Sequence, residues 1–351
     1  MVQTPLRKVR VMKEFTAYCP NAQIPFLTPK HLKQFDRLNL AFVVLKDGKL
    51  SFDKLNNISH LPRIREANPK LKVLMSVGGA GAAGFSNMAM TSEGREDFAK
   101  QCLNSCIEYG LDGMDLDWEF PCSVYEGMDS SPKDKENFTH LLKTIRETFD
   151  EYEKTSSKHL ELTIAAGVGQ WFIDQTEVPE FTRYLDHVFL MTYDLRGFGQ
   201  EETGHHTTLY TKENDIYRMS ADAGIQAWID LGVPAEKIHI GAGFYSHMWT
   251  NVIPDNNGLL QIGEGGGGFG PNYDELRDEY INKNGYTRYW DDEAKVPWLF
   301  DGSTFISYDD AKSVTYKCEY AKEHDLGGLF FWRYLDDPDN ELIDAIDENL
   351  N

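Results

Sequence analysis

Eight short runs of aliphatic and β-branched residues recur along this chain of 351 residues, and the segments between several of them have the apolar spacing of helices. Most of the runs are apolar at successive positions, as expected for strands of a parallel sheet that is covered on both faces. Strands that alternate with helices at this chain length predict a (β/α)8 barrel, the TIM-barrel class of α/β protein. The predicted strands are 9–18, 38–45, 72–79, 110–118, 160–168, 187–194, 237–245 and 327–332.

The clearest helical signal between the strands lies at 132–154. Ser131 can cap this helix and Pro132 suits its first position. A second helix is predicted from about Glu93 to Tyr109, where Gly110 ends it. The apolar stripe of the first helix comprises Phe138, Leu141, Leu142, Ile145 and Phe149.

The interval between the seventh and eighth predicted strands, roughly 85 residues, is too long for an ordinary connection between a strand and a helix. It contains turn-rich stretches, two aromatic strand-like pieces, "YTRYW" and "PWLF", and a short helical stretch near 273–282. We therefore expect a small α+β insertion domain at 246–305 on the top of the barrel. The barrel itself is then formed by 1–245 and 306–351.

The glycine run "GEGGGG" in this interval formally matches the dinucleotide-binding pattern G-x-G-x-x-G through Gly263, Gly265 and Gly268. However, no strand precedes it within a βαβ unit, no helix follows it at once, and Glu264 would face a phosphate. We therefore favour a flexible loop over a nucleotide site.

The net charge of −21 excludes several classes of partner, because nucleic acid, anionic membranes and polyphosphate would be repelled over most of the surface. No stretch approaches the roughly 20 apolar residues of a membrane span. Lys and Arg interrupt the apolar residues of the N terminus, unlike a signal peptide, so the localisation is either cytosolic or follows removal of a targeting segment. Five cysteines do not describe a disulfide framework, and Cys102 and Cys106 are expected to be core thiols.

The stretch "LDGMDLDWEF" at 111–120 places Asp112, Asp115, Asp117 and Glu119 within an apolar run. Alternate residues of a strand share a face, so Asp115, Asp117 and Glu119 should point into the barrel. Glu119 comes last, at the carboxyl end of the fourth strand, where barrel active sites are built. Three charges in a confined interior cannot all ionise at low cost, so protons must be shared and one carboxyl can serve as a general acid.

The acidic strand is also open to interpretations other than catalysis. An EF-hand loop would need glycine at its sixth position, but counting from Asp115 that position is Phe120. A Mg²⁺ or Ca²⁺ site on the strand stays open on geometry alone. The flanking Met114, Leu116 and Trp118 argue against a solvated face.

The acidic stretch resembles the D-G-x-D-x-D-x-E signature of family 18 glycoside hydrolases, the chitinases and their relatives. Other segments resemble the family in the same order, between about residues 10 and 340. They are "SVGG" (76–79), "MTYD" (191–194), "GGLFFW" (327–332), and "YWDDEAKVPWLF" followed by "STFISYDDAKS". The resemblance implies a barrel with a chitinase insertion domain, and it makes Asp112 and Gly113 structural members of the signature.

The resemblance implies a substrate-assisted mechanism, an exception to the usual pair of catalytic carboxylates. Glu119 is expected to protonate the leaving oxygen while the 2-acetamido carbonyl oxygen of the sugar attacks the anomeric carbon. Asp117 is expected to accept the acetamido N–H and to share a proton with Asp115, which Ser76 supports. Tyr193 is expected to donate its hydroxyl to the acetamido oxygen, and the β configuration is retained.

The sugar-binding residues that the resemblance implies are largely aromatic, because pyranose rings present apolar faces. Trp332 is expected to form the floor under the cleaved sugar, with Phe42 beside it, and Asp194 to fix the sugar. The other implied contacts are Met191, Trp118, Tyr245, Ser76, Gly79 and Arg196. Trp171, Trp249, Trp290 and Trp298 are further subsite candidates, for which core packing is the favoured alternative.

The chain departs from the family pattern in three places. After the seventh strand the family usually has Tyr-Gly-Arg, whereas this chain keeps Tyr245 but has Ser246 and His247. The first strand ends "AYCPN", without the aromatic that often follows the Tyr. Phe120 stands where Tyr is common.

The segment "GHHTTLY" at 204–210 contains two adjacent histidines. His205 and His206 are a poor metal pair, because neighbouring side chains diverge and no carboxylates complete a site. We expect a loop, which the resemblance places after the sixth strand and facing the substrate cleft.

The expected function is that of a retaining chitinase, which hydrolyses β-1,4 bonds between N-acetylglucosamine units in chitin or chitooligosaccharides. An alternative enzyme is an endo-β-N-acetylglucosaminidase acting on N-glycans, although an insertion domain that deepens a groove for linear chains tells against it. A chitin-binding lectin is the alternative from another class, but lectin members usually lose the acid that is present here as Glu119. We expect no metal or organic cofactor, no nucleic-acid or membrane partner, and a monomer that acts on soluble oligomers.

Overall fold

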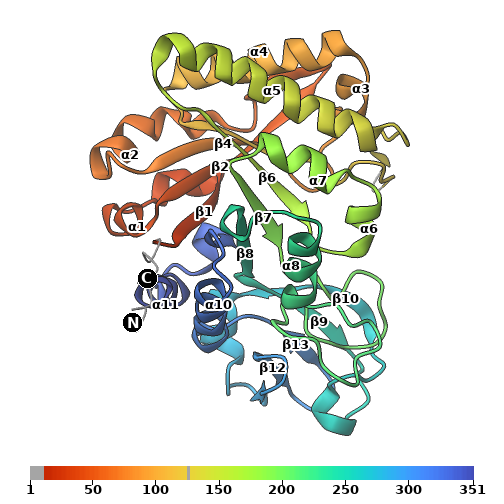
Figure 1. The fold of residues 1–351 in the computed structure, drawn as a ribbon. Helices are drawn as coiled ribbons and strands as arrows, with labels where there is room; N and C mark the ends of the chain where they lie inside the picture. The colour runs from red at the N-terminus through yellow and green to blue at the C-terminus, as the bar shows by residue number, and fades with distance from the viewer. Residues whose placement is uncertain (1–11, 125–126) are drawn as a thin grey trace, which may run out of the picture.

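The computed structural model describes residues 12–124 and 127–351, and its centre is a closed ring of eight parallel strands (Figure 1). β1 pairs with β2 on one side and with the last strand, β14, on the other, which closes the ring. The predicted (β/α)8 barrel is therefore confirmed, although residues 9–11 of the first predicted strand lie outside the described part. The barrel strands are β1 (Glu14–Pro20), β2 (Arg37–Lys46), β4 (Lys72–Gly78), β5 (Gly113–Asp117), β6 (Glu161–Gly167), β7 (His187–Met191), β8 (Ile238–Gly243) and β14 (Gly328–Trp332), and β3 (Lys49–Ser51) adds a short hairpin to β2.

Helices connect these strands and form the outer layer of the barrel (Figure 1). In the part of the chain that the structure describes, no helix has the length and apolar character needed to span a bilayer. The α-helices are α1 (Pro29–Gln34), α2 (Leu61–Ala67), α3 (Phe85–Ala89), α4 (Ser92–Tyr109), α5 (Asp134–Ser156), α6 (Gln170–Asp174), α7 (Val178–Phe181), α8 (Ala221–Asp230), α9 (Tyr273–Glu275), α10 (Ala311–Glu323) and α11 (Glu341–Leu350). Short 3-10 turns lie at Asn21–Phe26, Asn56–His60, Thr182–Tyr184, Ala235–Lys237, Asp255–Gly258 and Tyr334–Asp336, and a π-helical turn lies at Leu276–Tyr280.

Both predicted helices are present, but one begins later than expected. α4 is capped by Thr91, whose side chain accepts the amide of Gly94, and it ends at Gly110, which takes the left-handed φ of +66° that glycine tolerates. α5 begins at Asp134, two residues after the predicted start, and Ser131 does not cap it. The reason is that the carboxylate of Asp134 accepts the backbone amide of Ser131 at 2.8 Å and holds a separate turn before the helix.

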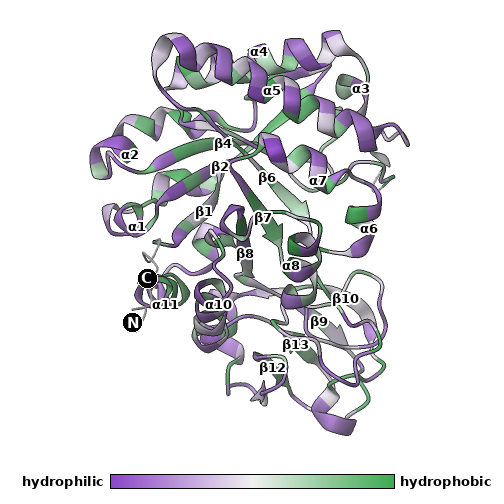
Figure 2. Ribbon diagram, in the orientation of Figure 1, coloured by the Kyte–Doolittle hydropathy of each residue, from purple (hydrophilic) through white to green (hydrophobic). Residues whose placement is uncertain are grey.

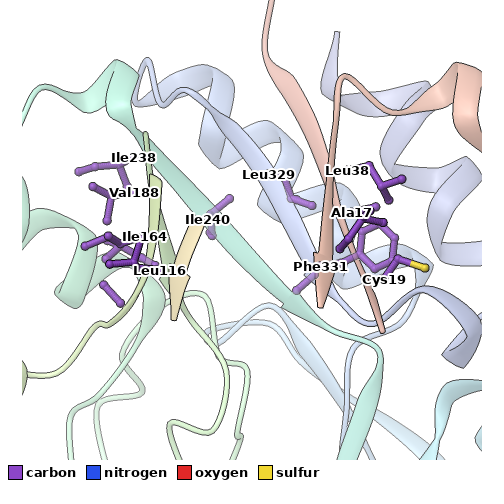
Figure 3. Packing of buried hydrophobic residues seen from close by; sticks show 14 of the residues in the cluster. Ala17, Cys19, Leu38, Leu116, Ile164, Val188, Ile238, Ile240, Leu329 and Phe331 are labelled. Atoms are coloured by element: carbon purple, nitrogen blue, oxygen red, sulfur yellow. The ribbon is translucent and has the colours of Figure 1, made fainter. Parts of the chain in front are cut away.

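The main hydrophobic core lies between the ring of strands and the surrounding helices. Figure 2 shows hydrophobic residues gathered on the central strands, with hydrophilic residues along the outer helices. Leu116, Ile164 and Val188 occupy successive strands of the ring and point outward into this core (Figure 3). Cys102 and Cys106 of α4 are buried with free thiols, as predicted.

A second sheet of five antiparallel strands follows β8 (Figure 1). Its first strand along the chain begins directly after Phe244, which follows the carboxyl end of β8. The sheet has a small hydrophobic core of its own that includes Trp249, Trp298 and Phe305. In sheet order, its strands are β10 (Glu264–Asn272), β9 (Tyr245–Thr250), β13 (Phe305–Ser307), β12 (Val296–Phe300) and β11 (Thr287–Asp291). We propose that this sheet forms the insertion domain of 246–305, although its first and last strands along the chain, β9 and β13, extend slightly past these limits.

The glycine run forms strand β10 and not the flexible loop that the sequence predicted. Glu264 pairs with Thr250 and Gly268 with Met248, with an irregularity between the two pairs. Gly265, Gly266 and Gly267 have φ values of +84°, +56° and +66° within this irregularity, a conformation that glycine adopts at little cost. Glycine is depleted in strands, so the run itself gave no indication that β9 would pair with it.

Candidate active site

A pocket lies at the carboxyl ends of the barrel strands, where active sites of this fold are built. Most of its walls come from the ends of the barrel strands or from the residues that follow them. The structure brings together here eight residues that the sequence analysis assigned to one site: Phe42, Asp117, Glu119, Met191, Tyr193, Asp194, Tyr245 and Trp332. The remaining lining residues are Tyr18, Ala80, Ala165 and Phe269.

Asp115 lies deepest in the row of acids and is fully buried. Its carboxyl group accepts hydrogen bonds from Tyr18 (2.9 Å), Ser76 (2.7 Å) and Thr163 (2.6 Å). Burial raises the pKa of Asp115, and the three hydroxyl donors partly offset this rise because they stabilise the charged form. Asp115 is therefore the member of the row that is best prepared to hold negative charge.

Asp117 is the next acid toward the pocket and it lacks such donors. Among the described residues, its Oδ1 atom is buried without a hydrogen-bond partner. Burial, followed by the charges of Glu119 and Asp115, raises the pKa of Asp117 well above its usual range. A buried carboxyl with an unused oxygen on the pocket wall is suited to a polar group of a bound ligand.

Glu119 is the last acid of the row, just beyond the end of β5. Burial, followed by the charge of Asp194, raises the pKa of Glu119 to about 8. The carboxyl group is therefore mostly protonated at neutral pH, which is the state that a general acid requires.

Tyr193 and Asp194 follow β7 and form the facing wall. Burial, followed by the charge of Asp117, raises the pKa of Tyr193 well above its usual value, so its hydroxyl remains a donor. Asp194 has a left-handed φ of +57°, which is uncommon for a residue with a side chain. Its Oδ1 atom accepts a hydrogen bond of 2.6 Å from the hydroxyl of Tyr245.

Aromatic rings form an apolar surface beside the acids. The rings of Phe42 and Trp332 are stacked, with centroids 5.4 Å apart and planes at 21°. Tyr18 lies edge-on to the neighbouring Phe330 and 6.2 Å from the ring of Trp332. Such a surface next to carboxyl groups suits a ligand with both apolar faces and hydroxyl groups.

Residues 12–337 match the family model "Glycosyl hydrolases family 18". The chain belongs to this family. Chitinase A1 of Niallia circulans is 38% identical over 311 residues, covering 84% of this chain and 44% of the relative. Chitotriosidase-1 of Mus musculus is 31% identical over 312 residues, covering 83% and 65% respectively. The chain thus spans less than two thirds of the length of these two relatives.

Solved structures of family 18 give a closer match. A family 18 N-acetylglucosaminidase from Paenibacillus barengoltzii superposes with a TM-score of 0.95 at 48% identity, covering 96% of this chain and 100% of that one. Chitinase ChiW from Paenibacillus sp. str. FPU-7 superposes with a TM-score of 0.91 at 35% identity, covering 97% and 33%. The sequence prediction of the family is confirmed by these matches.

Two of the predicted family 18 residues support the pocket without lining it. Ser76 lies below the pocket and donates to Asp115. Gly79 donates its backbone amide to the carbonyl of Asp117 at 2.9 Å. A Cβ atom on Gly79 would lie 2.7 Å from the ring of Phe42, so glycine is needed for that ring to take its place.

Trp118 and Arg196 were predicted to bind substrate, but the structure does not bring them to the pocket. Trp118 points outward from the barrel and stacks on Phe85 at 5.2 Å, because its strand neighbours Asp117 and Glu119 face inward. Arg196 is buried and forms ion pairs with Glu202 (3.1 Å) and Asp215 (2.7 Å). Both side chains are therefore structural in this arrangement.

Asp112 and Gly113 of the family signature lie at the amino end of β5, away from the pocket. Asp112 forms ion pairs with Arg65 (2.7 Å) and Lys158 (3.2 Å). A Cβ atom on Gly113 would lie 2.0 Å from the carbonyl oxygen of Glu161, so only glycine allows the close approach of β6. In this structure both residues contact neighbouring parts of the barrel and not the pocket.

The four tryptophans that were predicted as further subsites differ in their burial and contacts. Trp249 and Trp298 are buried in the core of the second sheet, and Trp290 stacks on Tyr316 at 5.8 Å. Trp171 is 41% exposed and lies edge-on to Phe120, with centroids 4.7 Å apart. Trp171 is thus the one member of this set that is open to a ligand next to the acid row.

Two groups of side chains could be considered as metal sites in the described part of the chain: Glu14, His187 and His239, and Asp194, His206 and His247. The acceptor oxygen of Glu14 already pairs with the guanidinium of Arg37 at 2.8 Å, and that positive charge disfavours a second cation. The Oδ1 atom of Asp194 already accepts a hydrogen bond from the hydroxyl of Tyr245, which leaves it less available to a metal ion. His205 pairs instead with Asp291 at 3.1 Å, whereas the adjacent His206 lies near Asp194 and His247.

The sequence analysis assigned no role at the site to Tyr18, Phe269 or His247. Tyr18 bonds Asp115 from β1, Phe269 reaches the pocket from the glycine run, and His247 contacts Asp194 at 2.7 Å. The family comparison drew attention to Tyr18 in "AYCPN" and to His247 as a departure, but it indicated the partner of neither.

Proposed function

We propose that the protein hydrolyses β-1,4 bonds between N-acetylglucosamine units in chitin or chitooligosaccharides, with retention of the β configuration. The observation that best supports this proposal is the placement of Glu119, whose pKa is raised to about 8 by burial, next to Asp117, whose Oδ1 atom has no partner among the described residues. One group can donate a proton and the other can accept an N–H group. Chitinases among the relatives support the same substrate class.

In the proposed reaction the nucleophile belongs to the substrate. Glu119 donates its proton to the glycosidic oxygen as the bond to the anomeric carbon breaks. The acetamido carbonyl oxygen attacks that carbon from the other face and forms an oxazolinium ion. Asp117 passes the proton that it shares to Asp115, accepts the acetamido N–H as a carboxylate and balances the positive charge. Tyr193 donates its hydroxyl to the acetamido oxygen.

Water completes the proposed cycle. Glu119, now a carboxylate, takes a proton from a water molecule, whose oxygen attacks the anomeric carbon and opens the oxazolinium ring. Two inversions at that carbon give net retention. Trp332 and Phe42 offer the apolar face on which the sugar rests during both steps. General acid–base help of this kind typically contributes about 10²- to 10⁴-fold in rate.

A second candidate is the release of single N-acetylglucosamine units from chain ends. The observation in its favour is that the relative described as an N-acetylglucosaminidase is 48% identical and matches almost the whole chain. An endo-β-N-acetylglucosaminidase of N-glycans is not favoured by the comparisons. A lectin is disfavoured by the presence of Glu119. Action as a monomer, without nucleic acid or membranes as partners, remains part of the proposal.

The test is a time course with N-acetylchitohexaose, in which fresh products are separated by length and by anomer. The parent protein should give β-anomers, and Glu119→Gln should bind the oligomer but turn it over at least about 100 times more slowly. N-acetylglucosamine as the first product would favour the chain-end candidate, and dimers to tetramers would favour a chitinase. Binding without turnover by the parent protein would contradict both.

A further inference from the structure

His247 of β9 lies fully buried behind the pocket, at the position where the sequence departs from the family motif. Its Nε2 atom is 2.7 Å from Oδ1 of Asp194, and its Nδ1 atom forms a hydrogen bond with the carbonyl oxygen of Gly267. A carboxylate and a carbonyl both only accept hydrogen bonds. Each ring nitrogen must therefore carry a hydrogen for both bonds to form.

The contact with His247 fixes one oxygen of Asp194. Tyr245 donates its hydroxyl to the same Oδ1 atom at 2.6 Å, so two donors converge on one side of the carboxylate. Asp194 itself lines the pocket and its side chain is one third exposed. The second oxygen of Asp194 is thereby the one left for a hydroxyl group of a ligand.

Two glycines make room for this arrangement. A Cβ atom on Gly197 would lie 2.5 Å from Nδ1 of His247, and one on Gly267 would lie 2.4 Å from the indole of Trp249. The carbonyl of Gly267 is held in place because it also accepts the amide of Phe198 at 3.2 Å. The glycine run therefore positions the carbonyl that holds the far side of the imidazole.

The groups packed around His247 are one carboxylate, aromatic rings and a second histidine. Asp194 is the carboxylate in contact with it, and the rings of Phe198 and Phe269 lie 4.8 Å and 5.4 Å away and limit access of water. His206 lies 4.8 Å away, and burial, followed by the charge of His247, lowers the pKa of His206 well below its usual value. His206 is thus neutral and does not compete for Asp194.

We propose that His247 is a positioning residue, which donates from its two ring nitrogens to Gly267 and Asp194 and so holds Asp194 with its second oxygen free to bind a hydroxyl of the sugar. The glycine run of β10 serves the site through this contact. The inference rests on the proposed function for its substrate, but the state of the imidazole can be measured without any turnover.

A matched pair of variants separates positioning from a structural role. In His247→Asn the side-chain nitrogen replaces Nδ1 and keeps the bond to Gly267, whereas in His247→Gln it replaces Nε2 and keeps the bond to Asp194. We expect His247→Asn to lower kcat/KM by about 10- to 100-fold, mainly through KM, and His247→Gln to lower it only a few-fold. The exposed His140→Gln serves as a control for the number of histidines.

The second readout is the ¹⁵N spectrum of protein labelled at histidine, at pH 7.5. Two imidazoles should have both nitrogens protonated, His247 and His159, whose ring lies between Glu153 and Asp186. The signal of His247 is the one that should vanish in His247→Asn and change in Asp194→Asn. Equal losses of activity in the Asn and Gln variants, or a spectrum in which His247 has one bare nitrogen, would overturn the proposal. A parent protein that shows the signal but does not cleave chitooligosaccharides would instead refute the proposed function.

Discussion

The carboxyl group of Glu119 and the carboxylate of Asp194 line the same pocket, one after β5 and the other after β7. After burial, the charge of Asp194 is the cause that raises the pKa of Glu119 to about 8. The group proposed to bind the sugar therefore also keeps the proton on the group proposed to cleave its bond. This relationship has a direct consequence for the pH dependence of the reaction.

We expect kcat/KM to fall as the pH rises through about 8, because Glu119 must be protonated to act and loses its proton there. In Asp194→Asn the negative charge is removed, so the pKa of Glu119 falls and the alkaline limb should move to lower pH. Initial rates on a chitooligosaccharide between pH 5 and 10 measure both profiles. An unchanged limb in Asp194→Asn would contradict the coupling of the two groups.

The same carboxyl should affect the stability of the protein. Between its ordinary pKa of 4.5 and the folded value of about 8, the folded state holds a proton that the unfolded state releases. The parent therefore loses stability as the pH rises across this window. Glu119→Gln has no such proton, so its free energy of unfolding should exceed that of the parent by about 1–3 kcal/mol at pH 8, with a smaller difference at pH 5. Urea unfolding at the two values tests this, and parallel differences would refute it.

Tyr193→Phe removes the hydroxyl that is proposed to orient the acetamido group. We expect kcat to fall by about 10- to 1000-fold with a smaller change in KM, because the donor acts on charge that develops in the transition state. The measurement is steady-state kinetics on a chitooligosaccharide. Tyr152→Phe on α5 is the matched control and should retain the parent rate. A rise in KM alone would assign Tyr193 to binding only.

Much of the fold could be predicted because its signals are local. Each barrel strand is a short apolar run, and the alternation along "DGMDLDWE" by itself put Asp115, Asp117 and Glu119 on one face. The closed ring and the pocket both follow from where those strands end. The family resemblance then supplied Tyr193 and Trp332 from distant segments.

The features that could not be predicted depend on contacts between segments that are far apart in the sequence and share no recognisable pattern. Tyr18 is 97 residues from Asp115, and nothing near it indicates that its hydroxyl would reach the acid row. The family motifs predicted that Trp118 and Arg196 bind substrate. In the structure Trp118 packs against Phe85 and Arg196 forms ion pairs with two acids, so neither side chain reaches the pocket. The glycine run formed a strand because β9 was available to pair with it.

A buried ion pair outside the pocket gives a prediction about stability alone. Nζ of Lys317 on α10 lies 2.6 Å from Oδ2 of Asp309, and both side chains are inaccessible to water. Lys317→Met leaves Asp309 buried without its counter-charge, so we expect a loss of about 3–5 kcal/mol in the free energy of unfolding. Chemical denaturation measures it.

The matched control for this variant is Lys143→Met, which breaks an exposed pair with Glu147 and should cost less than about 1 kcal/mol. Adding Asp309→Asn to Lys317→Met should restore part of the loss, because it removes the uncompensated charge. Equal losses in the free energy of unfolding for Lys317→Met and Lys143→Met would show that the buried pair stabilises the protein no more than the exposed pair does.

The pairing of β1 with β14 has a consequence for how the chain is made. The ring cannot close until Gly328–Trp332 has left the ribosome, and at about 5–20 residues per second the roughly 300 residues between the two strands take some 15 s or more to be synthesised. From the synthesis of β8 until β14 is added, β1 and β8 each expose an unpaired edge that can pair with another nascent chain. The last strand therefore closes the barrel, and a chain that ends before it would leave the edges of β1 and β8 unpaired.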